Sequence, residues 1–117
     1  VLCGDPNYMA PEQTRANTRI DARADIYAMG MSLFELTTGL LPFESLIDAP
    51  LATLLAAQRE AEPDPPSRWL PATTPPELAD RVDQIFARAC AKRPESRFQT
   101  AREMLAALQA PLGVELD

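Results

Sequence analysis

The sequence predicts an all-α fold built round one buried helix, and three observations support this. Residues 22–38 carry no charge between Asp25 and Glu35 and are apolar on nearly every face, as in a helix that other elements surround. No stretch shows the alternating apolar and polar residues of a β-strand. The 117 residues, of which 46% are hydrophobic and 24% charged, have the size and composition of one modest globular domain.

Residue signals mark both ends of this central helix. Asp21 can accept hydrogen bonds from free N–H groups of the first turn, and Gly39 can adopt the left-handed conformation that closes a helix. Asp25 is unusual because a carboxylate in a buried helix needs hydrogen-bond donors. Two interpretations stay open: Asp25 is an acid of the first turn, favoured by the helix dipole, or it faces inward and holds N–H groups of another segment.

Charge and cysteine content exclude several classes of function. The formal net charge of −6 argues against a surface whose main role is to bind nucleic acid. The chain has no histidine and only two cysteines, Cys3 and Cys90, which leaves no plausible zinc site and makes a disulfide framework unexpected. Two free thiols are typical of a reducing cytoplasm, so we expect a cytoplasmic location.

The segments on either side of the central helix are predicted from turn and cap residues. Residues 4–7 have the composition of a turn, and Pro11 stands where a short helix would begin, since a missing N–H is harmless there. A helix over residues 49–60 is predicted with Asp48 as its cap. Three leucines share one face of this helix and either pack in the core or form a docking surface: Leu51, Leu54 and Leu55.

A proline-rich loop and a third helix follow. Residues 61–76 hold six of the twelve prolines, which indicates an extended loop, held in place if Trp69 packs. A capping box of Thr74 and Glu77 opens a helix over residues 75–91. Its apolar positions recur at helical spacing: Leu78, Val82, Ile85, Phe86 and Ala89.

The last helix is predicted from a second capping box. Thr100 and Glu103 open it, it extends to about Gln109, and Pro111 ends it. Its inward-facing residues are expected to be Met104, Leu105 and Leu108.

Four short motifs lie in order along the chain: Gly4-x-Pro6-x-Tyr8-Met9-Ala10-Pro11-Glu12, Asp25-x-Tyr27-Ala28-x-Gly30, Leu36-x-Thr38-Gly39-x-x-Pro42-Phe43 and Lys92-x-Pro94-x-x-Arg97-Phe98. This series resembles the eukaryotic-like (Hanks-type) bacterial serine/threonine protein kinases, from the end of the activation segment onward. Ala28 replaces the serine that is common in the second motif. Each motif is short, but four in the right order over most of residues 4–108 make coincidence improbable.

The resemblance implies that this chain is the latter part of a kinase C-terminal lobe. We expect residues 1–110 to form a partial protein kinase domain and residues 111–117 a C-terminal tail. The family's glycine-rich loop, phosphate-holding lysine, catalytic aspartate and magnesium-binding aspartate would all precede Val1. The segment itself is therefore expected to hold no catalytic residue, no metal and no cofactor, while ATP and Mg serve the full-length parent.

The full-length parent is implied to transfer the γ-phosphoryl group of ATP to serine or threonine of protein substrates. The implied partners of this segment are those substrates and the missing N-terminal part of the kinase. Whether the parent has a membrane anchor stays open. The segment would contribute scaffold and substrate positioning and would not be active alone.

The resemblance also assigns roles to individual residues. Glu12 and Arg97 match the buried ion pair that anchors the end of the activation segment; the alternative is two solvated charges. Asp25 matches the acid that holds the backbone of the catalytic loop, which is the second interpretation given above. The substrate-positioning loop receives the residue next to the phosphoacceptor, and it comprises Gly4, Asp5, Pro6, Asn7, Tyr8 and Met9.

One position departs from the family pattern. Asp5 stands where these kinases carry a threonine whose hydroxyl bridges the catalytic aspartate and a nearby lysine. A second carboxylate there repels the first, although pairing with the lysine can offset the repulsion. A pseudokinase, or a helical interaction module without catalysis, is therefore the alternative function.

Overall fold

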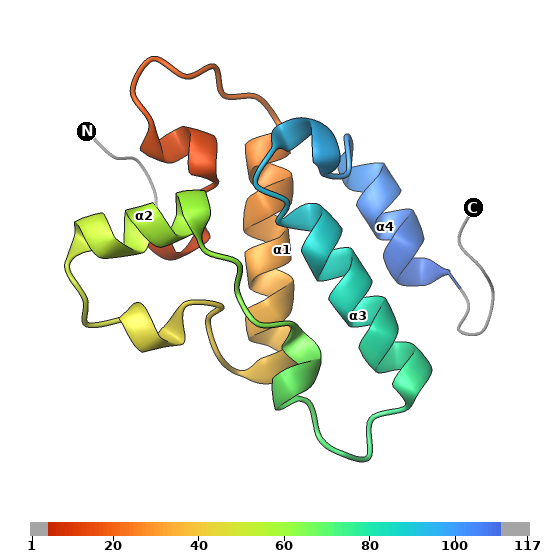
Figure 1. Cartoon of the computed structure of the whole chain (residues 1–117). Coiled ribbons are helices and arrows are strands. Elements are labelled where there is room, and N and C mark those ends of the chain that lie inside the picture. The colour runs from red at the N-terminus through yellow and green to blue at the C-terminus, as the bar shows by residue number, and fades with distance from the viewer. Residues whose placement is uncertain (1–4, 111–117) are drawn as a thin grey trace.

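The computed structural model describes residues 5–110, and every regular element in that range is a helix (Figure 1). The predicted all-α fold is confirmed, while Gly4 and the predicted tail 111–117 lie outside the described residues. The α-helices are α1 (Arg23–Thr38), α2 (Leu51–Glu60), α3 (Pro76–Ala89) and α4 (Ala101–Gln109). Short 3₁₀ helices lie between them: η1 (Pro6–Tyr8), η2 (Pro11–Thr14), η3 (Glu44–Leu46), η4 (Pro66–Trp69) and η5 (Pro94–Ser96).

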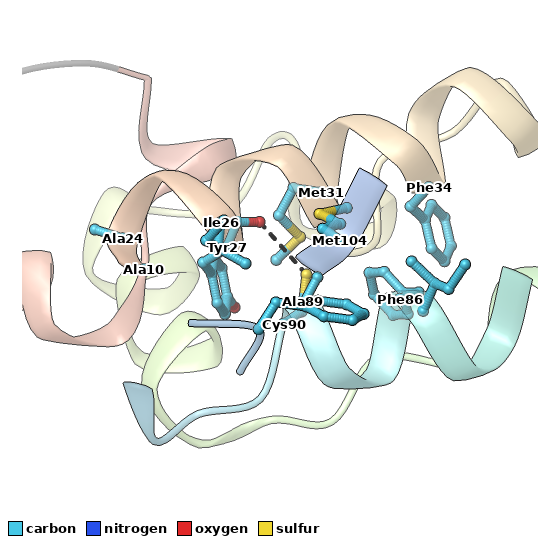
Figure 2. Packing of buried hydrophobic residues seen from close by; sticks show 12 residues of the cluster. Ala10, Ala24, Ile26, Tyr27, Met31, Phe34, Phe86, Ala89, Cys90 and Met104 are labelled. Atoms are coloured by element: carbon cyan, nitrogen blue, oxygen red, sulfur yellow. Dashed lines mark hydrogen bonds between the residues drawn. The ribbon is translucent and has the colours of Figure 1, made fainter. Parts of the chain in front are cut away.

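α1 is the central element. α3 packs along one side of it and α4 packs on α3, while α2 packs on η1 and η2 at another side of α1 (Figure 1). The core forms where α1 meets α3, with Tyr27, Met31 and Phe34 facing Phe86 and Ala89 (Figure 2). The ring centroids of Phe34 and Phe86 lie 5.1 Å apart, within the range of favourable aromatic pairs.

Gly30 allows α1 and the end of α3 to approach closely. A Cβ atom at this position would lie 2.4 Å from Sγ of Cys90 and 2.8 Å from Cβ of Ala89. The Cys90 thiol also donates a hydrogen bond to the backbone carbonyl of Tyr27, at 3.4 Å (Figure 2). Gly30, the glycine of the second motif, is therefore required for the close packing of α1 on the end of α3.

α1 is the predicted central helix, but one of its faces is not covered by other elements of residues 5–110. Met29 is 40% and Leu36 84% exposed, and Asp25 on the same face is exposed as well. α4 covers this face only in part, because it packs on α3 and contributes the buried Met104 alone. Two residues of α4 that were predicted to face inward are about half exposed: Leu105 and Leu108.

Three of the predicted helix-end signals are confirmed. Oδ1 of Asp21 accepts a hydrogen bond from the backbone N–H of Arg23 at 2.9 Å, and Gly39 closes α1 with a φ of 77°. At the start of α4, the Thr100 hydroxyl accepts from the N–H of Glu103 at 3.1 Å. No helix of residues 5–110 is long and apolar enough to cross a membrane.

The predicted caps of α2 and α3 are wrong, for the same reason in both helices. A proline occupies each N-cap position, Pro50 before α2 and Pro75 before α3, and its ring offers no acceptor for the first turn. Asp48 thus lies too far upstream to cap α2. Thr74 belongs to the turn before α3, where its N–H donates to the carbonyl of Pro71. Of the leucines on α2, Leu54 is buried while Leu51 is 50% exposed, and Leu78 on α3 is 39% exposed.

The proline-rich loop is held in place as predicted. The Trp69 ring meets the Phe34 ring edge to face with centroids 5.7 Å apart, although the side chain stays 38% exposed. The N–H of Ser67 donates to Oδ1 of Asp83 at 2.9 Å, which fixes η4 to α3. This loop therefore closes the lower end of the core between α1 and α3 (Figure 1).

Candidate functional site

Arg97 is the most heavily bonded side chain of the candidate site. It is 1% exposed and lies at the end of η5, where it meets η2 and the start of α1. Its two terminal nitrogens donate to the carboxylate of Glu12 at 2.7 and 2.8 Å in a bidentate pair. Its remaining hydrogen bonds, at 2.8 to 3.2 Å, go to the backbone carbonyls of Ala91, Lys92 and Arg23.

These five hydrogen bonds use the whole donor capacity of the guanidinium group. They join the segment around η5 to η2 and to the start of α1, and Glu12 and Arg97 are separated by 85 positions. The guanidinium carbon also lies 5.0 Å from the centroid of the Tyr27 ring, a favourable cation–π distance. The predicted pair of residues is therefore brought together with both charges buried, side-chain exposure being 0% and 6%.

Tyr27 connects this ion pair to α2. Its hydroxyl donates to Oε1 of Gln58 at 2.6 Å, and burial raises the pKa of Tyr27 far above its usual value. Nζ of Lys92 lies 3.0 Å from the carbonyl of Gln58 and 3.4 Å from that of Ala57, so it closes the last turn of α2. Burial lowers the pKa of Lys92.

Gln58 in turn holds the backbone of the predicted substrate loop. Its side-chain amide nitrogen donates to the carbonyls of Pro6 and Asn7, each at 3.1 Å, and the residue is fully buried. The carbonyl oxygens only accept hydrogen bonds, so the amide nitrogen of Gln58 must face them and its oxygen must face Tyr27. The orientation of the amide group is thus fixed by its partners.

Two further side chains shape the same loop. Oδ1 of Asp5 accepts from the backbone N–H and the side-chain amide of Asn7 at 2.9 and 3.0 Å, a local turn that caps η1. The hydroxyl of Tyr8 donates a short hydrogen bond to Glu35 on α1. This bond to a carboxylate, together with burial, raises the pKa of Tyr8 to about 12.

A hollow of about 170 Å³ lies between the loop and the first turns of α1. Asp5, Tyr8 and Met9 line it on one side and Asp25 and Ala28 on the other. The hollow adjoins a larger one of about 470 Å³ on the open face of α1, which Asp25 and Ala28 also line. Within residues 5–110, no side chain or backbone group donates a hydrogen bond to the carboxylate of Asp25.

The structure thus places the predicted site residues in two groups. Asp5, Tyr8, Met9 and Asp25 line one hollow, and Asp25 is exposed in the first turn of α1. Glu12 and Arg97 lie buried behind the loop. Sequence reasoning missed Gln58 and gave Lys92 no role. A signal for Gln58 existed, because it lies four positions after Leu54 and hence on the buried face of α2.

Comparison with known proteins identifies the family. The protein kinase domain family matches residues 1–108. The chain belongs to this family. Among its relatives are serine/threonine-protein kinase pkn3 of Myxococcus xanthus, 39% identical over 109 residues, and PknB of Mycolicibacterium smegmatis, 42% identical over 108 residues. PknB of Mycobacterium tuberculosis is 39% identical over 108 residues.

These matches cover 92 to 93% of this kinase-domain chain but only 16 to 19% of the relatives' own length. The similarity to bacterial serine/threonine kinases predicted from the four motifs is confirmed. The helical fold and the family together agree with a C-terminal-lobe segment of such a kinase.

Proposed function

We propose that this chain forms the C-terminal-lobe part of a serine/threonine protein kinase whose full-length form transfers the γ-phosphoryl group of ATP to protein serine or threonine. The observation that carries this proposal is the loop Asp5 to Met9, which is held from α1 and α2 beside a hollow that ends at Asp25. A loop held by hydrogen bonds next to an exposed carboxylate suits a surface that positions a peptide near the catalytic residues of the N-terminal part of the domain.

Each site residue has a role in this proposal. The loop receives the substrate residue next to the phosphoacceptor, and the Glu12–Arg97 pair anchors the segment that carries the loop. Asp25 accepts hydrogen bonds from the backbone of the catalytic loop, which the open hollow beside it leaves room for. ATP and Mg are bound by the N-terminal part of the domain, and we place the protein in the cytoplasm, where a free thiol such as Cys90 stays reduced.

Asp5 supports a second candidate, a pseudokinase. Its carboxylate binds Asn7 inside its own loop, so it has a structural task that needs no catalysis. A carboxylate at this position also lies where, in the proposed kinase, it would repel the catalytic aspartate. The two candidates differ in whether phosphoryl transfer occurs at all.

Phosphoryl transfer by the full-length protein separates the two candidates. A kinase incorporates phosphate from ATP into a serine/threonine peptide library, and Asp5→Thr should raise its kcat at least about tenfold because the repulsion is removed. A pseudokinase shows no incorporation in either form. Residues 1–117 alone should not bind magnesium-ATP, and micromolar, magnesium-dependent binding in a calorimetric titration would contradict the assignment to the C-terminal lobe.

A further inference from the structure

Gln58 is the one side chain of α2 that bonds to the substrate loop in the described part of the chain. It is a polar residue with 0% exposure on the face that also carries Leu54 and Ala57. A buried amide without partners would be destabilising, so its position depends on the three hydrogen bonds it makes. All three partners belong to α1 or to the loop.

Two backbone carbonyls of the loop, those of Pro6 and Asn7, accept hydrogen bonds from Gln58. The carbonyl of Asp5 is taken by the N–H of Tyr8 at 3.0 Å, and that of Pro6 by Met9 at a longer 3.4 Å. The carbonyl of Asn7 accepts from Gln58 alone among the described residues. Without the Gln58 amide, the part-buried carbonyl of Asn7 would lose its partner. The carbonyl of Pro6 would keep only the long hydrogen bond from the N–H of Met9.

The other side of Gln58 is fixed from the core. Tyr27, which orients the amide oxygen, is fully buried and lies beneath the guanidinium of Arg97. Lys92 holds the backbone carbonyl of Gln58 itself. Core residues therefore fix the conformation of the Gln58 side chain before any peptide binds. A residue that positions a substrate loop needs to be preorganised in this way.

We propose that Gln58 is a positioning residue for peptide recognition: from α2 it sets the backbone shape of the loop Pro6 to Tyr8 and thereby the fit of the residue next to the phosphoacceptor. This proposal rests on the proposed function. It assigns Gln58 no contact with ATP and none with the reacting atoms. Its loss should therefore change how the peptide binds and leave ATP binding as it was.

Gln58→Glu in the full-length protein is the sharpest variant. It keeps an oxygen for the Tyr27 hydroxyl but replaces the two donors to the carbonyls of Pro6 and Asn7 by a negatively charged acceptor. We expect the KM for a serine/threonine peptide to rise about tenfold while the KM for ATP stays within about twofold. The preference among peptides that differ next to the phosphoacceptor should weaken as well.

Two further variants make the result interpretable. Gln84→Glu adds the same charge on the exposed side of α3 and should leave both KM values unchanged. Tyr27→Phe removes only the hydroxyl that orients Gln58 and should give a smaller rise in the peptide KM, which keeps the test open if Gln58→Glu does not fold. Equal changes in the KM for peptide and for ATP would overturn the positioning role.

Amide hydrogen exchange gives an independent measurement that does not need activity. In Gln58→Glu, exchange should accelerate in residues 5–13 and stay unchanged in α3, whereas a general loss of stability accelerates both. Unchanged exchange in the loop would overturn the proposal. If the wild-type protein transfers no phosphate, the proposed function fails and substrate positioning with it, while exchange still decides whether Gln58 shapes the loop.

Discussion

The two sides of α1 differ in how completely other residues of the described chain cover their side chains and bond their polar groups. On the side facing η2, α2 and η5, Tyr27 and its neighbours bury a bidentate ion pair and an amide, each with its polar atoms bonded. On the opposite side, Leu36 is 84% exposed and the carboxylate of Asp25 faces an open hollow. One side of the helix thus carries buried polar groups that are fully hydrogen-bonded, and the other carries apolar side chains that are exposed.

This difference shows which part of the segment is self-contained. The polar core ties the substrate loop, the anchor residue Glu12 and the last helices into one unit through contacts of residues 5–110 only. The open face has the opposite character, since apolar side chains line a hollow of about 470 Å³ between α1 and α4. If the full-length protein is the proposed kinase, we expect this face to contact the N-terminal part of the lobe.

The largest effect is expected at Arg97. Arg97→Ala leaves the Glu12 carboxylate buried and without its partner and should lower the free energy of unfolding by about 3–5 kcal/mol. Arg93→Ala is a control in the same loop, because its pair with Glu95 is 80% and 58% exposed and should contribute less than about 1 kcal/mol. Urea unfolding measures both, and equal effects of the two substitutions would remove the contrast.

The second effect concerns the close packing of α1 on α3. Gly30→Ala places a methyl group 2.4 Å from Sγ of Cys90 and 2.8 Å from Cβ of Ala89, and the resulting overpacking should cost about 1–3 kcal/mol. Cys90→Ala in the same chain should recover part of this loss, because it removes the nearer atom. Thermal unfolding of the single and double variants tests the coupling, which is absent if the two effects simply add.

Much of the fold followed from local signals in the sequence. The ends of α1 were predictable because Asp21 and Gly39 act on backbone groups close to them in sequence. Trp69 packs on Phe34, which was the condition for the proline-rich loop to be held in place. The caps of α2 and α3 were not predictable from acceptor residues alone. Prolines occupy the N-cap positions of α2 and α3. A proline can set where a helix begins although its side chain has no hydrogen-bond acceptor.

The candidate site was predictable only where a family motif marked it. The motifs pointed to Glu12 and Arg97, and the structure places these side chains in contact across 85 positions. Gln58 lies in no motif, and its side-chain amide nitrogen donates to backbone carbonyls 51 and 52 positions away, which have no sequence signature. Periodicity showed that the open face of α1 is apolar, but it could not show which residues of this face other elements cover.

A smaller effect is expected for Tyr8, which ties the loop to α1. Tyr8→Phe removes the hydrogen bond to Glu35 and should lower stability at pH 7 by roughly 1 kcal/mol. The folded-state pKa of Tyr8, about 12, exceeds its usual value of 10.0, so the folded protein binds more protons in that interval. The stabilisation is therefore complete below pH 10 and is lost as the pH rises toward 12. Unfolding measured from pH 9 to 12 should show this decline in the wild type, and the difference between wild type and Tyr8→Phe should shrink with it.

The smallest effect within this chain, and the sharpest test of the comparison, is expected at Leu36. In the 117-residue chain the side chain is 84% exposed, so Leu36→Ser should change the free energy of unfolding by less than about 0.5 kcal/mol. The exposed apolar face should instead cause self-association or binding of an apolar dye, and the substitution should reduce both.

In the full-length protein the same substitution should behave differently. If the N-terminal part of the lobe covers this face, Leu36→Ser becomes a change in a core and should cost about 2–5 kcal/mol. Ile47→Ser is the control, since Ile47 is 60% exposed beyond η3 and should have little effect in either protein. Equal small effects of Leu36→Ser in both proteins, together with a monomeric short chain that binds no dye, would show that the open face is an ordinary surface. The contrast between the two sides of α1 would then reflect surface composition and not an interface within a larger lobe.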